Sequence, residues 1–221
     1  LHAIHQRDGK KLLAYSTITG NGFAVALFTY YLYIRDELSL AIMLIAVLAH
    51  MSYKTTLFLD IGLVEQITGF RYIHRLRGLV SIAPISAAGS LLAFLSLTGL
   101  PPTVGFASKL FAVVEAVFRI GDTPVTLVLT TILAYIALSI MIGLSYIKIY
   151  FGKPHFEEAG SVSSASSKQQ YLILSNSLSS LLFTAALALY PGFRSYFLIS
   201  VLASPMLLVF LFAFTTVMRR G

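Results

Sequence analysis

Long apolar runs, separated by short polar segments, dominate the pattern of this chain. About 20 consecutive apolar residues suffice for a helix that crosses a bilayer. Runs of this kind predict crossings at about residues 12–34, 38–63, 80–118, 124–147, 171–190 and 196–217. The one long polar connection, at 151–170, ends in a Ser-rich stretch that is typical of a surface loop. The pattern therefore predicts an all-α, polytopic transmembrane helix bundle of about six crossings.

The third run differs from the others because a Gly-Leu-Pro-Pro sequence interrupts it. Pro101 and Pro102 lack backbone donors, so a helix must stop or kink there, and Gly99 and Gly105 permit close or unusual backbone paths on either side. Lys109 follows at a depth where a charge is costly. Unwound backbone persists in a membrane only where protein buries it or where it lines a wet cavity, and transporters build ion pathways at such breaks. The alternative is a plain kinked span whose lysine reaches the interface.

Basic residues indicate that the interrupted run crosses once. In that topology 11 of the 16 Lys and Arg residues lie on one side and 3 on the other, with Lys54 and Lys109 inside the membrane. A hairpin that turns at the two prolines would give a split of 8 against 6. Because basic residues concentrate on the cytoplasmic side, the single interrupted crossing is favoured.

Composition narrows the class of protein and of chemistry. Hydrophobic residues make up 57% of the chain and charged residues 11%, against about 25% charged residues in soluble domains, which excludes a soluble fold. The absence of cysteine removes disulfides, thiolate metal sites and iron–sulfur ligation, so we expect no metal and no cofactor. The net charge of +7 reflects basic loops rather than a nucleic-acid partner. The chain opens on Leu1 without Met or a signal-peptide pattern, so we expect part of a longer protein or one half of a split one.

Ionisable residues also fall within the second predicted crossing. His50 and Lys54 are four residues apart and share one helix face, where they could be steps of a proton relay. The alternative is that both anchor the end of the span. Asp60 could be embedded in the membrane or lie at its interface, and Glu115 marks the end of the interrupted run.

Three stretches, in the same order, carry a family resemblance. They read QRDGKKLLAYST at 6–17, AHMSYKTTLFL at 49–59 and SLTGLPPTVGFASK at 96–109. They resemble the antiporter-like membrane subunits of respiratory complex I, of Mrp-type cation/proton antiporters and of energy-converting membrane hydrogenases. The second stretch looks closest to the Mrp and hydrogenase branch.

The resemblance implies a fold of two inverted five-helix repeats, of which this chain is the second repeat with a terminal helix. It implies boundaries at 1–150 for the repeat, 151–170 for a polar connecting loop and 171–221 for C-terminal transmembrane helices. Lys109 would be the ionisable residue of the broken helix, and Lys54 the central relay lysine with His50 beside it. Lys10 would be a further basic residue at a helix entrance. Asp60 stands where the family usually has an apolar residue, and it receives no role.

The resemblance also implies ion translocation, with the proton as the expected ion, by a membrane subunit of a redox-driven complex. Such a translocase subunit, similar to those of NADH:quinone oxidoreductase, has no redox centre of its own. The alternatives are a subunit of a stand-alone Mrp-type Na+/H+ antiporter and a structural subunit that has lost transport. Expected partners are lipids and other membrane subunits, one of which supplies the missing first repeat. The expected location is a mitochondrial inner or prokaryotic cytoplasmic membrane.

Overall fold

Six α-helices build the part of the chain that the computed structural model describes, residues 5–121, 123–151, 166–187 and 189. The predicted span at 196–217 lies outside these residues. Two short 3-10 turns, Ile73–Arg75 and Leu79–Ser81, join the second helix to the third. The helices are α1 (Gly9–Ile34), α2 (Glu37–Thr68), α3 (Pro84–Thr98), α4 (Val104–Phe118), α5 (Thr123–Ile147) and α6 (Ser167–Leu187).

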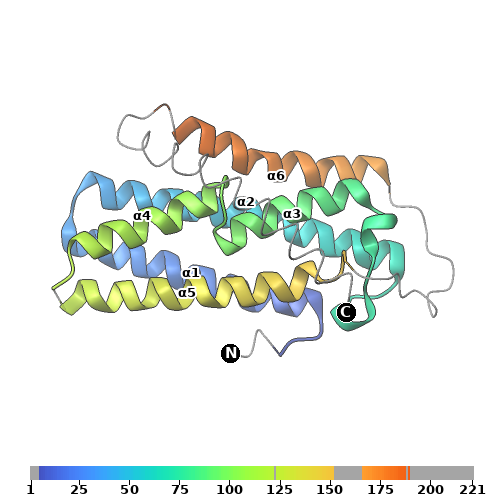
Figure 1. Cartoon of the computed structure of the whole chain (residues 1–221), viewed down its shortest axis with the longest axis horizontal. Helices are drawn as coiled ribbons and strands as arrows, with labels where there is room; N and C mark the ends of the chain where they lie inside the picture. The colour runs from blue at the N-terminus through green and yellow to red at the C-terminus, as the bar shows by residue number, and fades with distance from the viewer. Residues whose placement is uncertain (1–4, 122, 152–165, 188, 190–221) are drawn as a thin grey trace.

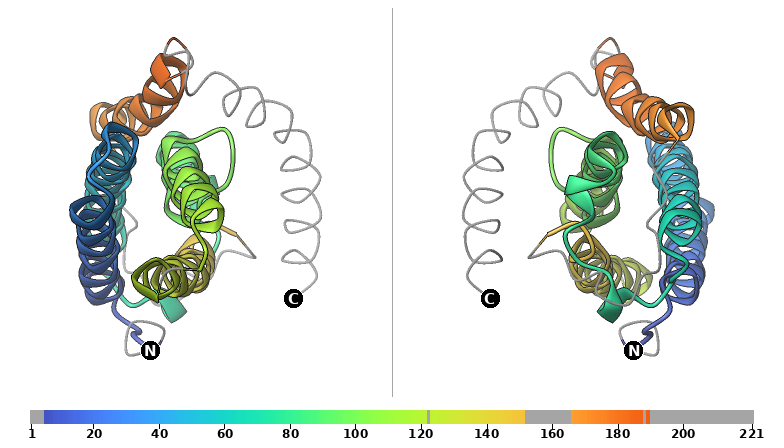
Figure 2. Two further views of the ribbon diagram at one scale, coloured as in Figure 1. Left: turned by 90° about the vertical axis from the view of Figure 1, so that its left-hand side faces the viewer. Right: turned by 90° about the vertical axis from the view of Figure 1, so that its right-hand side faces the viewer.

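The helices run roughly parallel to one long axis. Figure 1 shows that α3 and α4 lie end to end, so that together they cover about the length that α2 covers alone. Both α3 and α4 pack against α2 and α5. In the end-on views of Figure 2, α6 lies at one edge of the bundle, on α2 and α3, and α5 lies at the opposite edge. The interrupted run is therefore one discontinuous helix and not a hairpin.

Helix ends follow from local sequence signals. Asp8 precedes α1, and its carboxylate accepts hydrogen bonds from the N–H groups of Lys10 (2.9 Å) and Lys11 (3.2 Å). Asp36 caps α2 in the same way through the N–H of Ser39 at 2.8 Å. The helix α2 continues five residues beyond the end of the predicted crossing at 38–63, so Glu65 lies on the helix. The buried side chains of the last turns of α2 explain this extension.

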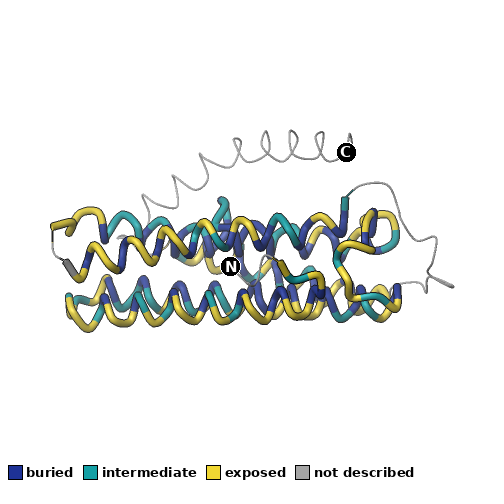
Figure 3. Tube along the Cα trace, turned by 90° about the horizontal axis from the view of Figure 1, so that it is seen from below, coloured by how far each residue is buried: buried dark blue, intermediate teal, exposed yellow. Residues whose placement is uncertain are grey.

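Three helices, α1, α2 and α5, are long and apolar enough to cross a membrane, and α3 is a shorter apolar helix. Their outward faces carry exposed apolar side chains. In Figure 3 exposed positions alternate with buried ones along each helix. The helix α6 covers residues 171–187 of the predicted span and begins four residues before it. The face of α6 that meets α2 carries polar side chains, and two of them, Asn176 and Ser179, form hydrogen bonds with α2.

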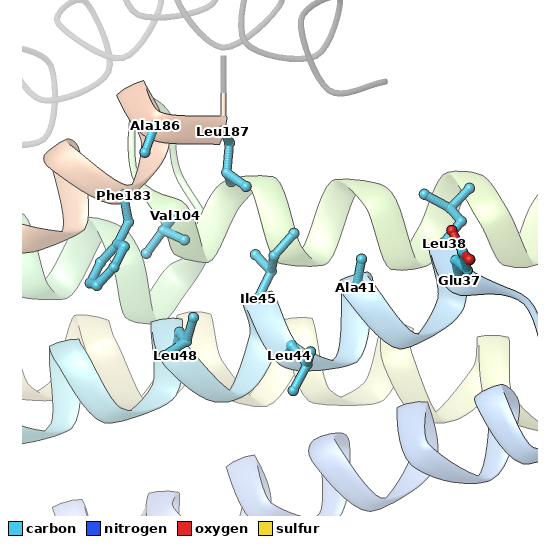
Figure 4. Close-up of a pocket in the computed structure, with 10 residues that line it drawn as sticks. All are labelled: Glu37, Leu38, Ala41, Leu44, Ile45, Leu48, Val104, Phe183, Ala186 and Leu187. Carbon is cyan, nitrogen blue, oxygen red and sulfur yellow. The ribbon is translucent and has the colours of Figure 1, made fainter. Parts of the chain in front are cut away.

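An apolar cavity of about 660 Å³ opens between α2, α4 and α6. Figure 4 shows Val104, the first residue of α4, facing Phe183 and Leu187 of α6 across it. Apart from Glu37 at one end, its lining side chains are aliphatic or aromatic. The cavity therefore offers hardly any polar ligand to an ion, and ion-binding groups must be sought elsewhere in the bundle.

Candidate functional site: a lysine bound at the helix break

The helix break has capped ends on both sides. Gly99 closes α3 in the left-handed conformation, with a φ of 78°. Its N–H and that of Leu100 both donate to the carbonyl of Leu95, at 3.0 and 2.8 Å. Thr103 opens α4, and its hydroxyl accepts a hydrogen bond from the N–H of Phe106 at 3.3 Å. The interruption is thus a defined structure of two caps with a Pro-Pro link.

The break leaves the last carbonyls of α3, among them those of Ser96 and Leu97, without their usual backbone donors. In a continuous α-helix the carbonyl of Leu97 would accept from the N–H of residue 101. That residue is Pro101, which has no N–H. The carbonyl of Ser96 would accept from Leu100, whose N–H bonds to Leu95 instead. The two carbonyls are consequently free to bind another donor.

Lys109 supplies this donor. Its ammonium donates to the carbonyl of Leu97 and lies 3.4 Å from that of Ser96, and the residue is only 5% exposed. The carboxyl end of a helix carries partial negative charge, which favours a cation there. The predicted pairing of the break with Lys109 is therefore a direct contact between the lysine and the backbone that the break exposes.

Both predicted glycines are needed for this contact. A Cβ on Gly99 would lie 2.5 Å from Cδ of Lys109, and a Cβ on Gly105 would lie 1.9 Å from the carbonyl oxygen of Ser96. The first glycine leaves room for the lysine side chain. The second lets the first turn of α4 press against the last turns of α3.

Two tyrosines connect the break to His50. The ammonium of Lys109 lies over the ring of Tyr135, 5.3 Å from its centroid. The hydroxyl of Tyr135 is 2.8 Å from that of Tyr53, which in turn is 3.1 Å from Nδ1 of His50. Sequence reasoning missed both tyrosines. Tyr53 lies inside the quoted His-x-x-x-Lys stretch, which was a signal, whereas Tyr135 lies in an apolar run and gave none.

Lys54 is buried on the α1 side of α2 and is 6% exposed. Its ammonium donates to the hydroxyl of Ser16 and, at 2.9 Å, to the carbonyl of Leu13. His50, one turn earlier, packs against Gly20, where a Cβ would lie 2.1 Å from the imidazole ring. His50 and Lys54 are both on α2, four residues apart, and share a helix face as predicted.

Lys10 lies apart from this cluster. It is exposed in the first turn of α1 and forms an ion pair with Glu65 of α2. Close by, Arg71 pairs with the carboxylate of Asp8 at 2.9 Å. Lys10 thus occupies the helix entrance that the resemblance predicts, about one turn of α1 before the residues that bind Lys54.

Asp60 is fully buried inside the bundle. Its carboxylate accepts hydrogen bonds from Ser86 of α3 at 2.5 Å, from Tyr146 of α5 at 2.6 Å and from Tyr150, which follows α5. The two tyrosines are four residues apart, but Tyr150 lies in the turn after α5, so helix periodicity did not predict that they meet one partner. Nothing in the sequence indicated that either tyrosine meets Asp60.

The family described as NADH:quinone oxidoreductase/Mrp antiporter, transmembrane, matches residues 1–137 of the chain. The chain belongs to this family. The prediction from the three sequence stretches is thereby confirmed, together with the multi-pass, all-helical membrane fold.

Relatives within the family include large antiporter proteins. A probable K(+)/H(+) antiporter protein of Rhizobium meliloti is 32% identical over 158 residues, which cover 69% of this chain and 15% of that protein. A Na(+)/H(+) antiporter protein of Alkalihalophilus pseudofirmus is 33% identical over 117 residues, which cover 48% of this chain and 14% of that protein. Both are named as components of multi-subunit antiporters. The chain thus spans about one-seventh of the length of these curated relatives.

Solved structures share the fold. A chain of the Mrp complex from Dietzia sp. DQ12-45-1b matches with a TM-score of 0.65 and 20% identity, over 83% of this chain and 41% of that one. A chain of respiratory complex I from Thermus thermophilus matches with a TM-score of 0.56 and 27% identity, over 83% of this chain and 39% of that one. This family member therefore corresponds to about two-fifths of each solved chain.

Proposed function

We propose that this chain translocates protons across a membrane as one subunit of a larger complex. The observation that carries the proposal is Lys109, held at the helix break and linked through Tyr135 and Tyr53 to His50. A bundle with no transport role would gain nothing from this arrangement, because buried lysines are costly in a membrane.

The relay would run between the two buried lysines by way of His50. Each hydroxyl in the Tyr53–Tyr135 pair can be donor or acceptor, so the pair can carry a proton in either direction between His50 and a group that hydrogen-bonds to the Tyr135 hydroxyl. Lys109, whose ammonium lies over the ring of Tyr135, would join this path through a water molecule between its Nζ and that hydroxyl. Histidine accepts and releases protons near neutral pH. The break would hold the Lys109 ammonium in place between transfers.

The charges of the lysines would be controlled from outside the chain. Among the described residues no acidic side chain pairs with Lys54 or Lys109, whose partners are neutral carbonyl and hydroxyl oxygens. A carboxylate of a neighbouring subunit that approached either lysine would favour the ammonium, and its withdrawal would favour the neutral amine. A first five-helix repeat, with its own glutamate–lysine pair, is the source that we propose for such a carboxylate.

Two kinds of complex fit this role. A redox-driven complex of the complex I or membrane hydrogenase type, in an energy-transducing membrane, is the first. The second is a stand-alone cation/proton antiporter, and the names of the curated relatives as components of K(+)/H(+) and Na(+)/H(+) antiporters favour it. Proton uptake into vesicles that contain the purified complex separates them, because the first requires an electron donor and the second requires only a Na+ or K+ gradient.

Replacement of Lys54 by Met tests the relay itself. The assembled complex should lose most of its proton uptake, because Lys54 is one of the two lysines between which the relay runs. Lys54→Arg should not restore uptake, because arginine does not release its proton in proteins. Lys168→Met removes a lysine from the exposed end of α6 and is the matched control with normal uptake. Normal uptake in the assembled Lys54→Met complex would disprove the relay.

A further inference from the structure

The first three turns of α2 carry an apolar strip that forms the floor of the cavity between α2, α4 and α6. Ala41, Leu44 and Leu48 recur along it at spacings of three and four residues, so they lie on one face of the helix. Leu44 is 50% exposed and Leu48 is 45% exposed. Figure 4 shows that the strip continues past Leu187, the last residue of α6, as far as Glu37. The described helices therefore leave the cavity open along this strip.

The length of the cavity matches one leaflet of a bilayer. Its outer end lies at Glu37, where α2 begins at the membrane interface, and its inner end lies at Leu48 and Val104. Val104 opens α4 directly after the helix break, in the middle of the interrupted crossing. The rise of α2 from Glu37 to Leu48 is about 16 Å. Half of the hydrocarbon core of a bilayer is about 15 Å. A single acyl chain that enters at the interface would thus fill the cavity from end to end.

The outer end of the cavity carries an available negative charge. Asp36 is paired with Arg119 at 2.8 Å, whereas Glu37 takes part in no ion pair among the described residues. A carboxylate at this position attracts a cation and repels the head group of an anionic lipid. A primary ammonium can also donate hydrogen bonds to the carboxylate, which a quaternary ammonium without N–H groups cannot do. Charge and hydrogen bonding therefore both favour a head group with a primary amine.

We propose that this cavity binds one acyl chain of an aminophospholipid of the phosphatidylethanolamine type, whose ammonium pairs with Glu37. The chain would run along the strip of α2 and end against Val104 and Phe183, beside the helix break. The proposal rests on the membrane-spanning fold, the cavity and its charged end. It stands whether or not the lysine relay conducts protons.

Fluorescence quenching by brominated lipids tests the site, because the chain has no Trp and one introduced Trp is an unambiguous reporter. Leu44→Trp places the reporter in the cavity. Leu133→Trp is the matched control, because Leu133 lies on α5 and is also 50% exposed. The full chain is reconstituted in phosphatidylcholine vesicles that contain a minor fraction of dibrominated phosphatidylethanolamine or, in parallel, of dibrominated phosphatidylcholine.

The Leu44→Trp reporter should show an apparent affinity for phosphatidylethanolamine about two- to fivefold higher than for phosphatidylcholine, as one exposed ion pair provides. Leu133→Trp should show no preference. Addition of Glu37→Gln to Leu44→Trp should abolish the preference while quenching by either acyl chain persists.

Three results would overturn the proposal. Equal quenching of Leu44→Trp by the two lipids would mean that bulk lipid fills the cavity without selection. Absence of quenching would mean that a protein segment covers the cavity instead of a lipid. A preference that survives Glu37→Gln would mean that this carboxylate does not recognise the head group.

Discussion

Replacement of Gly99 by alanine tests whether the helix break exists to hold Lys109. Two costs can be worked out from the structure. The left-handed conformation, with a φ of 78°, costs an alanine about 1–2 kcal/mol. The new Cβ would also lie 2.5 Å from Cδ of Lys109, so the lysine must retreat by about 1 Å to reach an ordinary carbon–carbon contact. That movement would break its hydrogen bond to Leu97, which as a bond to a charged group contributes about 1.5–3 kcal/mol.

The chain offers a matched control for the first cost. Gly69 closes α2 with a φ of 72°, and a Cβ there would meet nothing within 4 Å. Gly69→Ala should therefore lower the free energy of unfolding by about 1–2 kcal/mol and leave proton uptake unchanged. Gly99→Ala should lower it by about 2.5–5 kcal/mol, the sum of the two costs, and should reduce uptake strongly.

Thermal unfolding of the purified protein and proton uptake in vesicles are the two measurements. In a Gly99→Ala background, Lys109→Ala should add little to either loss, because the contact that it removes is already broken. If Gly69→Ala and Gly99→Ala reduced stability and uptake to the same degree, the contact between the break and Lys109 would have no special role.

Three further predictions concern the break, the topology and a helix cap. Replacing both prolines of the break by alanine restores N–H groups that compete for the carbonyls of α3, so uptake should fall, and adding Lys109→Ala should reduce it little further; additive losses would contradict a shared function. Because the chain has no native cysteine, single cysteines at Arg75 and Ile120 can be labelled cleanly, and they should label from opposite sides of the membrane; labelling from one side would indicate a hairpin. Asp36→Ala should lower the free energy of unfolding by about 1 kcal/mol through loss of the α2 cap, measured by thermal unfolding. Partial burial raises the pKa of Asp36, but hydrogen bonds from Ser39 in the first turn of α2 and the charge of Arg119 lower it more, so the pKa lies below its ordinary value. The ionised cap should therefore stabilise wild type at neutral pH, and this stabilisation should be lost as the pH falls below the ordinary range of an aspartate.

The fold could be predicted from the sequence because its signals are local. Apolar run length located the helices of the described residues, and the Pro-Pro sequence between two glycines located the break. The boundaries were less accurate, because tertiary packing extends α2 beyond Leu63 and because α6 begins inside the stretch that composition assigned to a loop. The polar inner face of α6 likewise follows from partners on α2 that no local pattern reveals.

The site was only partly predictable for the same reason. Lys109, Lys54 and His50 could be identified because ionisable residues are rare in apolar runs. Their contacts could not, because carbonyls are present at every residue and only the three-dimensional arrangement shows which ones are free. Tyr135 was invisible, since a tyrosine in an apolar run is common. Asp60 was conspicuous but unexplained, because its hydroxyl partners come from two other parts of the chain.

The close approach of the two half-helices has a mechanical consequence. At Gly105 no side chain separates the first turn of α4 from the carbonyl of Ser96, so α3 and α4 touch backbone to backbone. Main chain packed this tightly yields little to compression. The break therefore resists any motion that presses the two half-helices together. A push on α4 toward α3 would be transmitted to the carbonyls that bind the Lys109 ammonium and would not be absorbed between the two helices.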